Sequence, residues 1–151
     1  MADPFCDVLC AGIVVADHVC APISHVPAAG ELVQSNRMLL TLGGCAANVA
    51  VNLHKLGMRA RVVGRVGDDP FAGIFRALLV EAGLDASGLI ATPGRLTSQT
   101  MIINVAGQDR RFVHHFGANA AFAAGDVPLG LVRQARILYL GGYLLMPALT
   151  Q

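Results

Sequence analysis

The chain has 151 residues and a formal net charge of +1, with 11 Lys and Arg against 10 Asp and Glu. This length suits one domain with its own core, and the balanced charge argues against a nucleic-acid-binding surface. Hydrophobic residues make up 54% of the sequence, but the apolar runs are shorter than the ~20 residues of a membrane-spanning helix. We therefore expect a cytoplasmic protein that binds neither nucleic acid nor membrane.

The predicted elements alternate between buried strands and helices. In chain order they are a strand at 5–16 that begins with Phe5, a loop at 22–31, a strand at 32–41, a helix at 46–56, a strand at 60–67, a helix that starts at Pro70, a short strand at 89–91, two hairpin strands at 98–105 and 110–116, a helix at 126–135 and a strand at 136–142. Gly57 and Gly83 fit helix C-terminal stops, and Asp69 fits an N-cap.

This order predicts an α/β layered fold with a mainly parallel sheet. The strands at 32–41 and 98–116 do not fit that core, and their polar edges suggest a flap or lid. The sequence stops soon after a buried strand, where a loop would lead into the next helix. We therefore expect the front half of a larger domain.

The cysteines give no sign of a disulfide framework or a metal site. The four are Cys6, Cys10, Cys20 and Cys45. They form no Cys-x-x-Cys pair, and no His cluster completes a zinc pattern. We interpret them as reduced, mostly buried thiols, as is usual in the cytosol. The N-terminus also lacks the basic segment of a signal peptide.

The stretch "TLGGCAANVAVNLHKLG" at 41–57 is the first candidate site. Its glycines, Gly43 and Gly44, lack the G-x-G-x-x-G spacing of a dinucleotide site, and no Gly-Lys-Ser/Thr follows to make a P-loop. Free N–H groups at the helix start, with Asn48 in the first turn, suit a ligand rich in hydroxyls. The alternative is a packing pair of glycines with a solvated Asn48, and the residues alone favour neither.

Several carboxylates are candidates, each with a structural alternative. Asp17 ends the first apolar run, where ligands bind in open α/β sheets, and its carboxylate can accept two hydroxyl groups. Its alternative role is to cap a turn, and the residue by itself favours that alternative. Asp68 and Asp69 could hold a metal, and Asp126 in "AAGD" could be a catalytic base. For Asp69 and Asp126 the helix-cap interpretation is favoured.

The histidines offer weaker candidates. His114 and His115 are adjacent in a predicted strand, so they should face opposite sides and should not share a metal. His18 and Arg111 are candidate ligand contacts without other support. No metal site is therefore expected.

Together these stretches resemble the ribokinase-like (PfkB) carbohydrate kinases along essentially the whole chain. "GIVVADHV" resembles the first strand of that family, with its sugar-contacting Asp at Asp17, and "PAAGELVQ" resembles the loop that leads to the lid. "LGGCAANVAVNLHKLG", continued by "VGRVGDDPFAG", resembles the N-terminal signature. "FGANAAF" and "ILYLGG" resemble later stretches of the family.

The resemblance implies a ribokinase-like three-layer α/β/α (Rossmann-like) fold with a small β lid near 19–41 and 98–116. It implies phosphoryl transfer from ATP, with Mg2+, to a primary hydroxyl of a sugar or nucleoside. In many relatives the lid strands also form a homodimer contact. The residues that would hold the sugar hydroxyls are Asp17, Gly43, Gly44 and Asn48.

The departures from the family pattern limit this expectation. The second family signature, Gly-Ala-Gly-Asp, supplies the anion hole and the catalytic Asp, and "AAGD" at 123–126 lacks the pattern that should follow it. The resemblance thus implies that residues 1–151 are the N-terminal part of one domain. The ATP-binding half, the catalytic base, and bound ATP and Mg2+ would then be missing from this chain. The alternative is a truncated, non-catalytic protein that binds a sugar or pairs with another chain, whereas a nicotinamide-dependent enzyme fits poorly.

Overall fold

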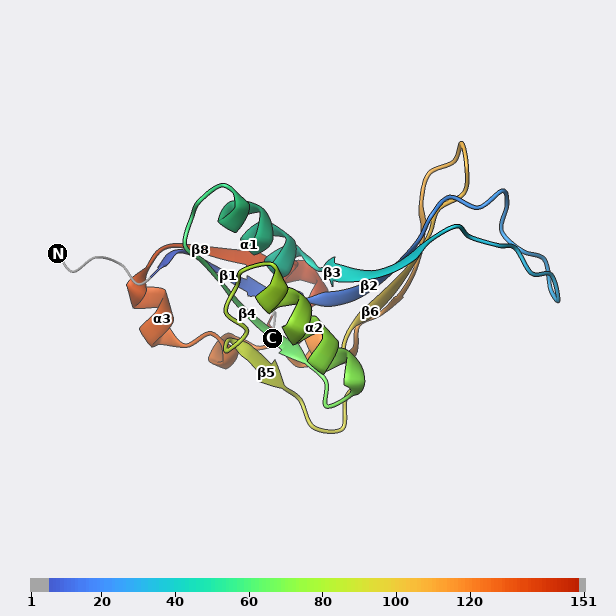
Figure 1. The fold of residues 1–151 in the computed structure, drawn as a ribbon. Coiled ribbons are helices and arrows are strands. Elements are labelled where there is room, and N and C mark those ends of the chain that lie inside the picture. Colours follow the sequence, from blue (N-terminus) through green and yellow to red (C-terminus); the bar gives the residue numbers. More distant parts are fainter. Residues whose placement is uncertain (1–5, 150–151) are drawn as a thin grey trace.

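The computed structural model describes residues 6–149, which form two sheets and three α-helices (Figure 1). The main sheet contains β1 (Cys6–Gly12), β4 (Ala60–Val66), β5 (Leu89–Ala91) and β8 (Ala135–Gly141). The second sheet contains β2 (Val15–Cys20), β3 (Met38–Gly43), β6 (Gln99–Ile103) and β7 (Arg111–His115). The helices are α1 (Cys45–Lys55), α2 (Pro70–Glu81) and α3 (Leu129–Gln134), with short 3₁₀ segments η1 (Gly117–Ala121), η2 (Ala124–Asp126) and η3 (Tyr143–Leu145). Phe5 lies outside the described residues.

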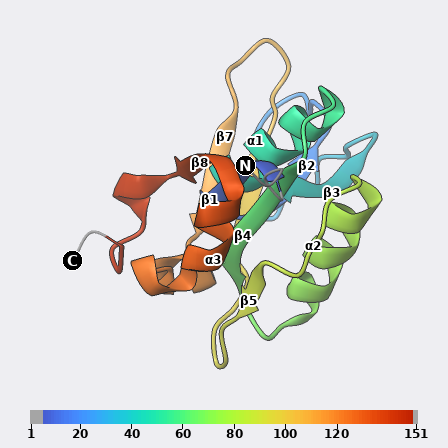
Figure 2. The same ribbon diagram turned by 90° about the vertical axis from the view of Figure 1, so that its left-hand side faces the viewer.

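The main sheet is fully parallel, in the order β5-β4-β1-β8. Helices α1 and α2 cover one face and α3 covers the other, as Figure 2 shows. Along β1, Val8 and Cys10 pack toward α1 and α2, whereas Leu9 packs with Phe122 and Met146 on the opposite face. Both faces of β1 are therefore buried, which explains its unbroken apolar run. The predicted three-layer α/β/α fold is confirmed.

The apolar run predicted as one strand is two strands that belong to different sheets. β1 ends at Gly12, whose φ is 126°, and the Ile13 N–H donates to the Gly141 carbonyl at 3.1 Å. Asn119 then holds Val14, because its Nδ2 donates to the Val14 carbonyl at 2.9 Å and its Oδ1 accepts from the Val14 N–H at 3.3 Å. The prediction of a single strand was wrong because the junction is as buried as the strands beside it.

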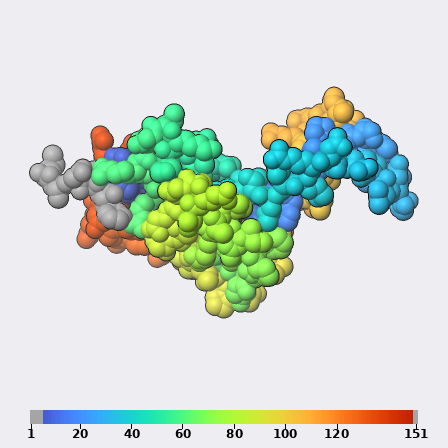
Figure 3. Space-filling model, viewed as in Figure 1, coloured from blue at the N-terminus to red at the C-terminus, as the bar shows by residue number. Residues whose placement is uncertain are grey.

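The second sheet, in the order β3-β2-β6-β7, extends away from the helices as an arm (Figures 1 and 3). Its β6–β7 pair confirms the predicted hairpin. The strand predicted at 32–41 instead begins at Met38, which pairs with Cys20. Because β2 ends at Cys20, the residues before Met38 have no ladder partner on β2. The sheet also begins at Val15, earlier than the predicted lid boundary at 19.

The predicted helix ends of α1 and α2 are confirmed. Asp69 caps α2, accepting the Ala72 N–H at 3.1 Å, and Pro70 follows it. Gly57 and Gly83 come just after the two helices with φ of 86° and 84°, which only glycine adopts at low cost. Asp69 also accepts hydrogen bonds from the N–H and the hydroxyl of Thr97. Its carboxylate oxygens are thus used within the fold, which does not support the metal interpretation.

Asp126 does not have its predicted role as the N-cap of α3. The helix begins at Leu129 after Pro128, and Asp126 ends η2. Its carboxylate accepts the Ala123 N–H at 2.8 Å and two hydrogen bonds of 2.6 Å from the Arg65 guanidinium. This bidentate pair ties the segment before α3 to β4.

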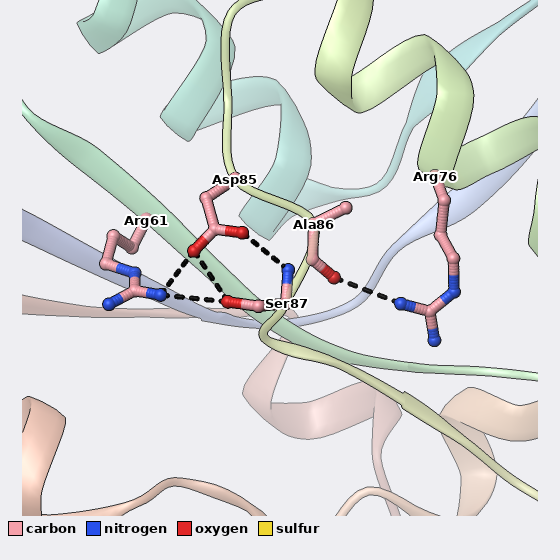
Figure 4. Close-up of polar contacts among 5 residues, drawn as sticks. All are labelled: Arg61, Arg76, Asp85, Ala86 and Ser87. Carbon is pink, nitrogen blue, oxygen red and sulfur yellow. Dashed lines mark hydrogen bonds and ion pairs between the residues drawn. The ribbon is translucent and has the colours of Figure 1, made fainter.

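A second polar cluster fixes the loop between α2 and β5 (Figure 4). Arg61 binds the Asp85 carboxylate and donates to the Ser87 hydroxyl at 2.9 Å. The Ser87 N–H donates to Asp85 at 2.8 Å, and Arg76 donates to the Ala86 carbonyl at 3.0 Å. These bonds anchor the loop to β4 and α2, so we read the cluster as structural.

The four cysteines are free, but only Cys6 and Cys10 are buried. Burial raises the pKa of the Cys10 thiol to about 11, which keeps it protonated and unreactive. Cys20 is partly buried and Cys45 is exposed, so the expectation of mostly buried thiols was wrong for Cys45.

Within residues 6–149, no helix is long and apolar enough to cross a membrane.

Candidate functional site

A row of four polar side chains crosses the second sheet. Asp17 on β2 pairs with Thr41 on β3 and with Thr100 on β6, and Thr100 pairs with His114 on β7. Residues that pair across neighbouring strands project from the same face. Asp17 thus lies in the middle of β2 and not at the end of a main-sheet strand, where it was expected.

The Asp17 carboxylate is half-buried and hydrogen-bonded. Burial raises its pKa above the ordinary value of 3.8, while a hydrogen bond from the Thr100 hydroxyl and the nearby His114 act in the opposite direction. A carboxylate has more acceptor sites than one hydroxyl can fill. Asp17 can therefore accept further hydrogen bonds from a ligand that carries hydroxyl groups.

Gly43 and Gly44 lack side chains for two different reasons. A Cβ on Gly43 would meet Asp17 Oδ2 at 2.1 Å, so this glycine makes room for the carboxylate. A Cβ on Gly44 would meet the Ile13 carbonyl oxygen at 2.5 Å, and its φ of 86° also favours glycine. The Ala46 N–H donates to the same Ile13 oxygen at 3.0 Å, so one helix-start donor is already used. Packing explains Gly44, whereas Gly43 is tied to the candidate site.

Asn48 lies one turn along α1 from the glycines, and it is exposed. It lines a hollow of about 480 Å³ between α1, β3 and α2, together with Thr41 and Lys55. Asp17 is not one of the described residues that line this hollow. Thr41 connects the two places, since it also pairs with Asp17. The structure thus brings Asp17 and the glycines together and leaves Asn48 beside them.

The other candidate side chains lie apart from Asp17. His18 faces the opposite side of the second sheet, where its Nε2 lies 3.0 Å from Gln99 Oε1. His114 and His115 occupy successive positions of β7 and so face opposite sides, as predicted. Arg111 lies at the far end of β7 from His115. In the described part of the chain, no three His, Cys, Asp or Glu side chains group closely enough to hold a metal.

The opposite face of the second sheet is apolar and hollowed. The hollow has a volume of about 640 Å³. Met38 and Met101 line it, and both are more than half exposed. Exposed apolar surface of this kind often marks an interaction site.

Sequence analysis missed Thr100 as a member of the site. Thr100 is only 8% exposed and contacts both Asp17 and His114. Its position beside Asp17 depends on the register of β2 against β6. These two strands come from segments that lie some eighty residues apart in the sequence. A period-two pattern identifies such strands without revealing their register.

Comparison with known proteins gives a consistent result. Residues 7–151 match the family described as "pfkB family carbohydrate kinase". Fructokinase-1 from Zea mays is 29% identical over 123 residues, which cover 79% of this chain and 38% of that protein. Probable fructokinase-3 from Arabidopsis thaliana is 29% identical over 113 residues, or 74% of this chain and 33% of that protein. The chain therefore spans about a third to two fifths of the length of these relatives.

Solved structures show the same fold. A ribokinase from Thermotoga maritima superimposes with a TM-score of 0.73 at 24% identity, covering 89% of this chain and 44% of that one. A fructokinase from Xylella fastidiosa superimposes with a TM-score of 0.71 at 25% identity, covering 89% of this chain and 42% of that one. Both carry the ribokinase-like arrangement predicted from the sequence.

Proposed function

Because this chain belongs to the pfkB family of carbohydrate kinases, we propose that it is the sugar-binding part of a kinase. The complete enzyme transfers the γ-phosphoryl group of ATP to a primary hydroxyl of a sugar or nucleoside. In this proposal residues 1–151 form the N-terminal part of one domain, the second sheet is its lid, and the protein acts in the cytoplasm. The ATP-binding part lies in sequence beyond this chain.

The half-buried Asp17 carboxylate carries this proposal. It is held over the bare backbone of Gly43 and has acceptor capacity left after binding Thr100. Adjacent sugar hydroxyls can each donate to a carboxylate, and a charged acceptor makes such bonds stronger than neutral ones. Because Gly43 has no side chain, the Asp17 carboxylate can lie against the backbone there. Gly44 and Asn48 complete the proposed binding set.

The chain's own residues would bind and orient the sugar and exclude water. Phosphoryl transfer depends on positioning and charge stabilisation, and water near the transferred group would compete with the sugar. Asp17 lies on β2 of the second sheet, and this sheet extends away from the main sheet (Figure 1), so in this proposal it covers the sugar. The base that accepts the hydroxyl proton comes from outside the chain in this proposal.

ATP and a divalent metal are the cofactors that a carbohydrate kinase implies. Among residues 6–149, no acidic or histidine cluster fits a metal ion, and the Gly43–Gly44 turn lacks the Gly-Lys-Ser/Thr of a P-loop. In this proposal ATP and Mg2+ are therefore held by other residues of the complete kinase. The proposed contribution of residues 6–149 is confined to the sugar.

Substitution of Asn48 tests the assignment. In the complete kinase, Asn48→Ala should raise the KM for D-fructose or D-ribose by about tenfold, the worth of one good hydrogen bond, and leave the KM for ATP nearly unchanged. Gly73→Ala is the control, because Gly73 lies on α2 with nothing near its Cβ position and does not line the hollow beside Asn48. Equal effects on both substrates, or none on the sugar, would contradict the sugar role.

The 151-residue chain alone should show no phosphoryl transfer.

A second candidate function is pairing with another chain, supported by the surface of β8. This strand lies at the edge of the main sheet, and Ile137, Leu138 and Leu140 on it are between 37% and 54% exposed. An open edge with apolar side chains favours strand addition.

The apolar hollow on the second sheet supports a homodimer through the lid strands in the same way. Sedimentation of the chain with and without D-fructose separates these outcomes: a sugar-binding monomer contradicts pairing, and an associated chain that binds no sugar favours it.

A further inference from the structure

Three side chains of the polar row follow one another across neighbouring strands. The Thr100 hydroxyl lies 2.8 Å from His114 Nδ1. Thr100 is also the cross-strand partner of Asp17, and hydrogen bonding by its hydroxyl lowers the pKa of the Asp17 carboxylate. Thr100 is 8% exposed, so water reaches this hydroxyl poorly. The three residues come from β2, β6 and β7 and are in register with one another. Asp17 is thus connected to a histidine two strands away.

The direction of these bonds follows from the single proton of a hydroxyl group. An ionised carboxylate only accepts, so a Thr100 hydroxyl that bonds Asp17 must be the donor. Thr100 can then only accept from His114, and Nδ1 must carry a proton. With the bond to Asp17 made, neutral His114 is held in the Nδ1–H tautomer, which leaves Nε2 as an acceptor.

The surroundings of His114 support this arrangement. Its ring meets Phe116 edge-on, with centroids 4.5 Å apart and planes at 89°, which restricts its rotation. Burial lowers the pKa of His114, the Asp17 charge raises it, and the neighbouring His115 lowers it. His18, next to Asp17 on β2, faces the other side of the sheet. Asp17 is thus the one negative charge among the groups that shift His114.

We propose that His114 is a positioning residue for the Asp17 carboxylate and acts through the Thr100 hydroxyl. The inference rests on the proposed function, in which Asp17 binds sugar hydroxyls. With Thr100 bound on one side and Gly43 below, the carboxylate is held in a single orientation before the sugar arrives. Such pre-organisation increases affinity because less rotational freedom is lost on binding.

Nitrogen-15 NMR of the histidine side chains tests the chain of bonds without any sugar. At a pH where His114 is neutral, Nδ1 should carry the proton, whereas Thr100→Val should release the ring to the usual mixture of tautomers. Asp17→Asn should lower the pKa of His114, because it removes the nearby negative charge. A wild-type His114 protonated on Nε2, or one that does not respond to Asp17→Asn, overturns the proposal.

Titration with D-fructose and D-ribose tests the effect on binding. His114→Leu should raise Kd about five- to tenfold, the worth of one hydrogen bond. His114→Asn places an N–H donor near the Nδ1 position and should restore Kd to within about twofold of wild type. His115→Leu is the matched control on the opposite face. In the Thr100→Val background, His114→Leu should add no further loss, because both changes break the same chain.

The outcomes separate this proposal from the function on which it rests. If NMR shows the Nδ1–H tautomer and the response of His114 to Asp17→Asn, but His114→Leu binds sugar like wild type, then His114 does not position Asp17. If wild type binds neither sugar, the proposed function fails, and the NMR result alone decides whether His114 holds Asp17. Circular dichroism of each variant verifies folding. Equal losses in His114→Leu and His115→Leu would also overturn the proposal, since they would indicate a general effect on β7.

Discussion

The carboxylate of Asp17 occupies the space that a side chain on Gly43 would need. A Cβ on Gly43 would lie 2.1 Å from Asp17 Oδ2 and 2.3 Å from Asp17 Cγ. The two residues are twenty-six positions apart in the sequence and meet because Val15 pairs with Gly43, two residues from Asp17 on the same strand. A glycine of the helix-start motif and an acidic residue of the second sheet therefore form one unit.

We expect Gly43→Ala to displace Asp17 and weaken binding of D-fructose by about tenfold or more. The added methyl group cannot coexist with the carboxylate, and overpacking of this kind costs about 1–3 kcal/mol of stability unless Asp17 turns toward solvent. Isothermal titration and urea unfolding measure the two effects. Gly73→Ala is the control, because Gly73 lies inside α2 with nothing near its Cβ position. That change should add up to about 1 kcal/mol of stability without altering sugar binding.

Asp17→Asn should stabilise the protein at neutral pH while it weakens sugar binding. Burial raises the pKa of Asp17 in the folded state above 3.8. The folded protein then binds this proton more tightly than the unfolded chain, so the ionised carboxylate lowers stability as pH rises through the folded pKa. The uncharged variant lacks this cost. Its advantage in urea unfolding should be present at pH 7 and should disappear as the pH falls to 3.8 and below.

Asn119→Ala should be among the most destabilising single changes. Asn119 is fully buried and binds both the N–H and the carbonyl of Val14 at the junction of β1 and β2. Its removal leaves two buried backbone groups without a partner, at about 1–3 kcal/mol each. We expect a loss of about 3 kcal/mol in urea unfolding. Asn52→Ala, which removes an exposed bond to the Asn48 carbonyl, should cost less than about 0.5 kcal/mol.

Asp126→Asn should make stability less dependent on acid pH. Burial alone would raise the pKa of Asp126, but hydrogen bonds from Arg65 and from the Ala123 N–H bring it below 3.8. The ionised group therefore contributes stability above its unfolded pKa, and this contribution is lost as pH falls through the lower folded pKa. At pH 7 we expect the variant to lose about 2 kcal/mol, the worth of a hydrogen bond to a charged group. A difference that stays constant from pH 7 to pH 2 would contradict this account.

Much of the fold could be predicted from local signals. The Asp69 cap and the Gly57 and Gly83 stops act within one helical turn, so their residues identify them directly. The side-chain alternation that separates His114 from His115 is equally local. The break between β1 and β2 was not predictable in this way, because Gly12 and the apolar residues after it are as buried as a strand interior. Asp126 was misassigned because its partner, Arg65, is sixty-one residues away.

The sequence by itself determined the family, the glycine and acidic residues of the candidate site, and the order of strands and helices apart from the break between β1 and β2. Each of these depends on residue types at short spacing, which a single chain displays in one dimension. Only the tertiary structure decided that Asp17 lies on the second sheet and that Gly43 makes room for it. It also decided that Thr100 and His114 follow Asp17 in the same row across β6 and β7. The physical reason is strand register. Which residues meet across neighbouring strands depends on the packing of segments far apart in the chain, and a shift of one residue would move every side chain to the opposite face.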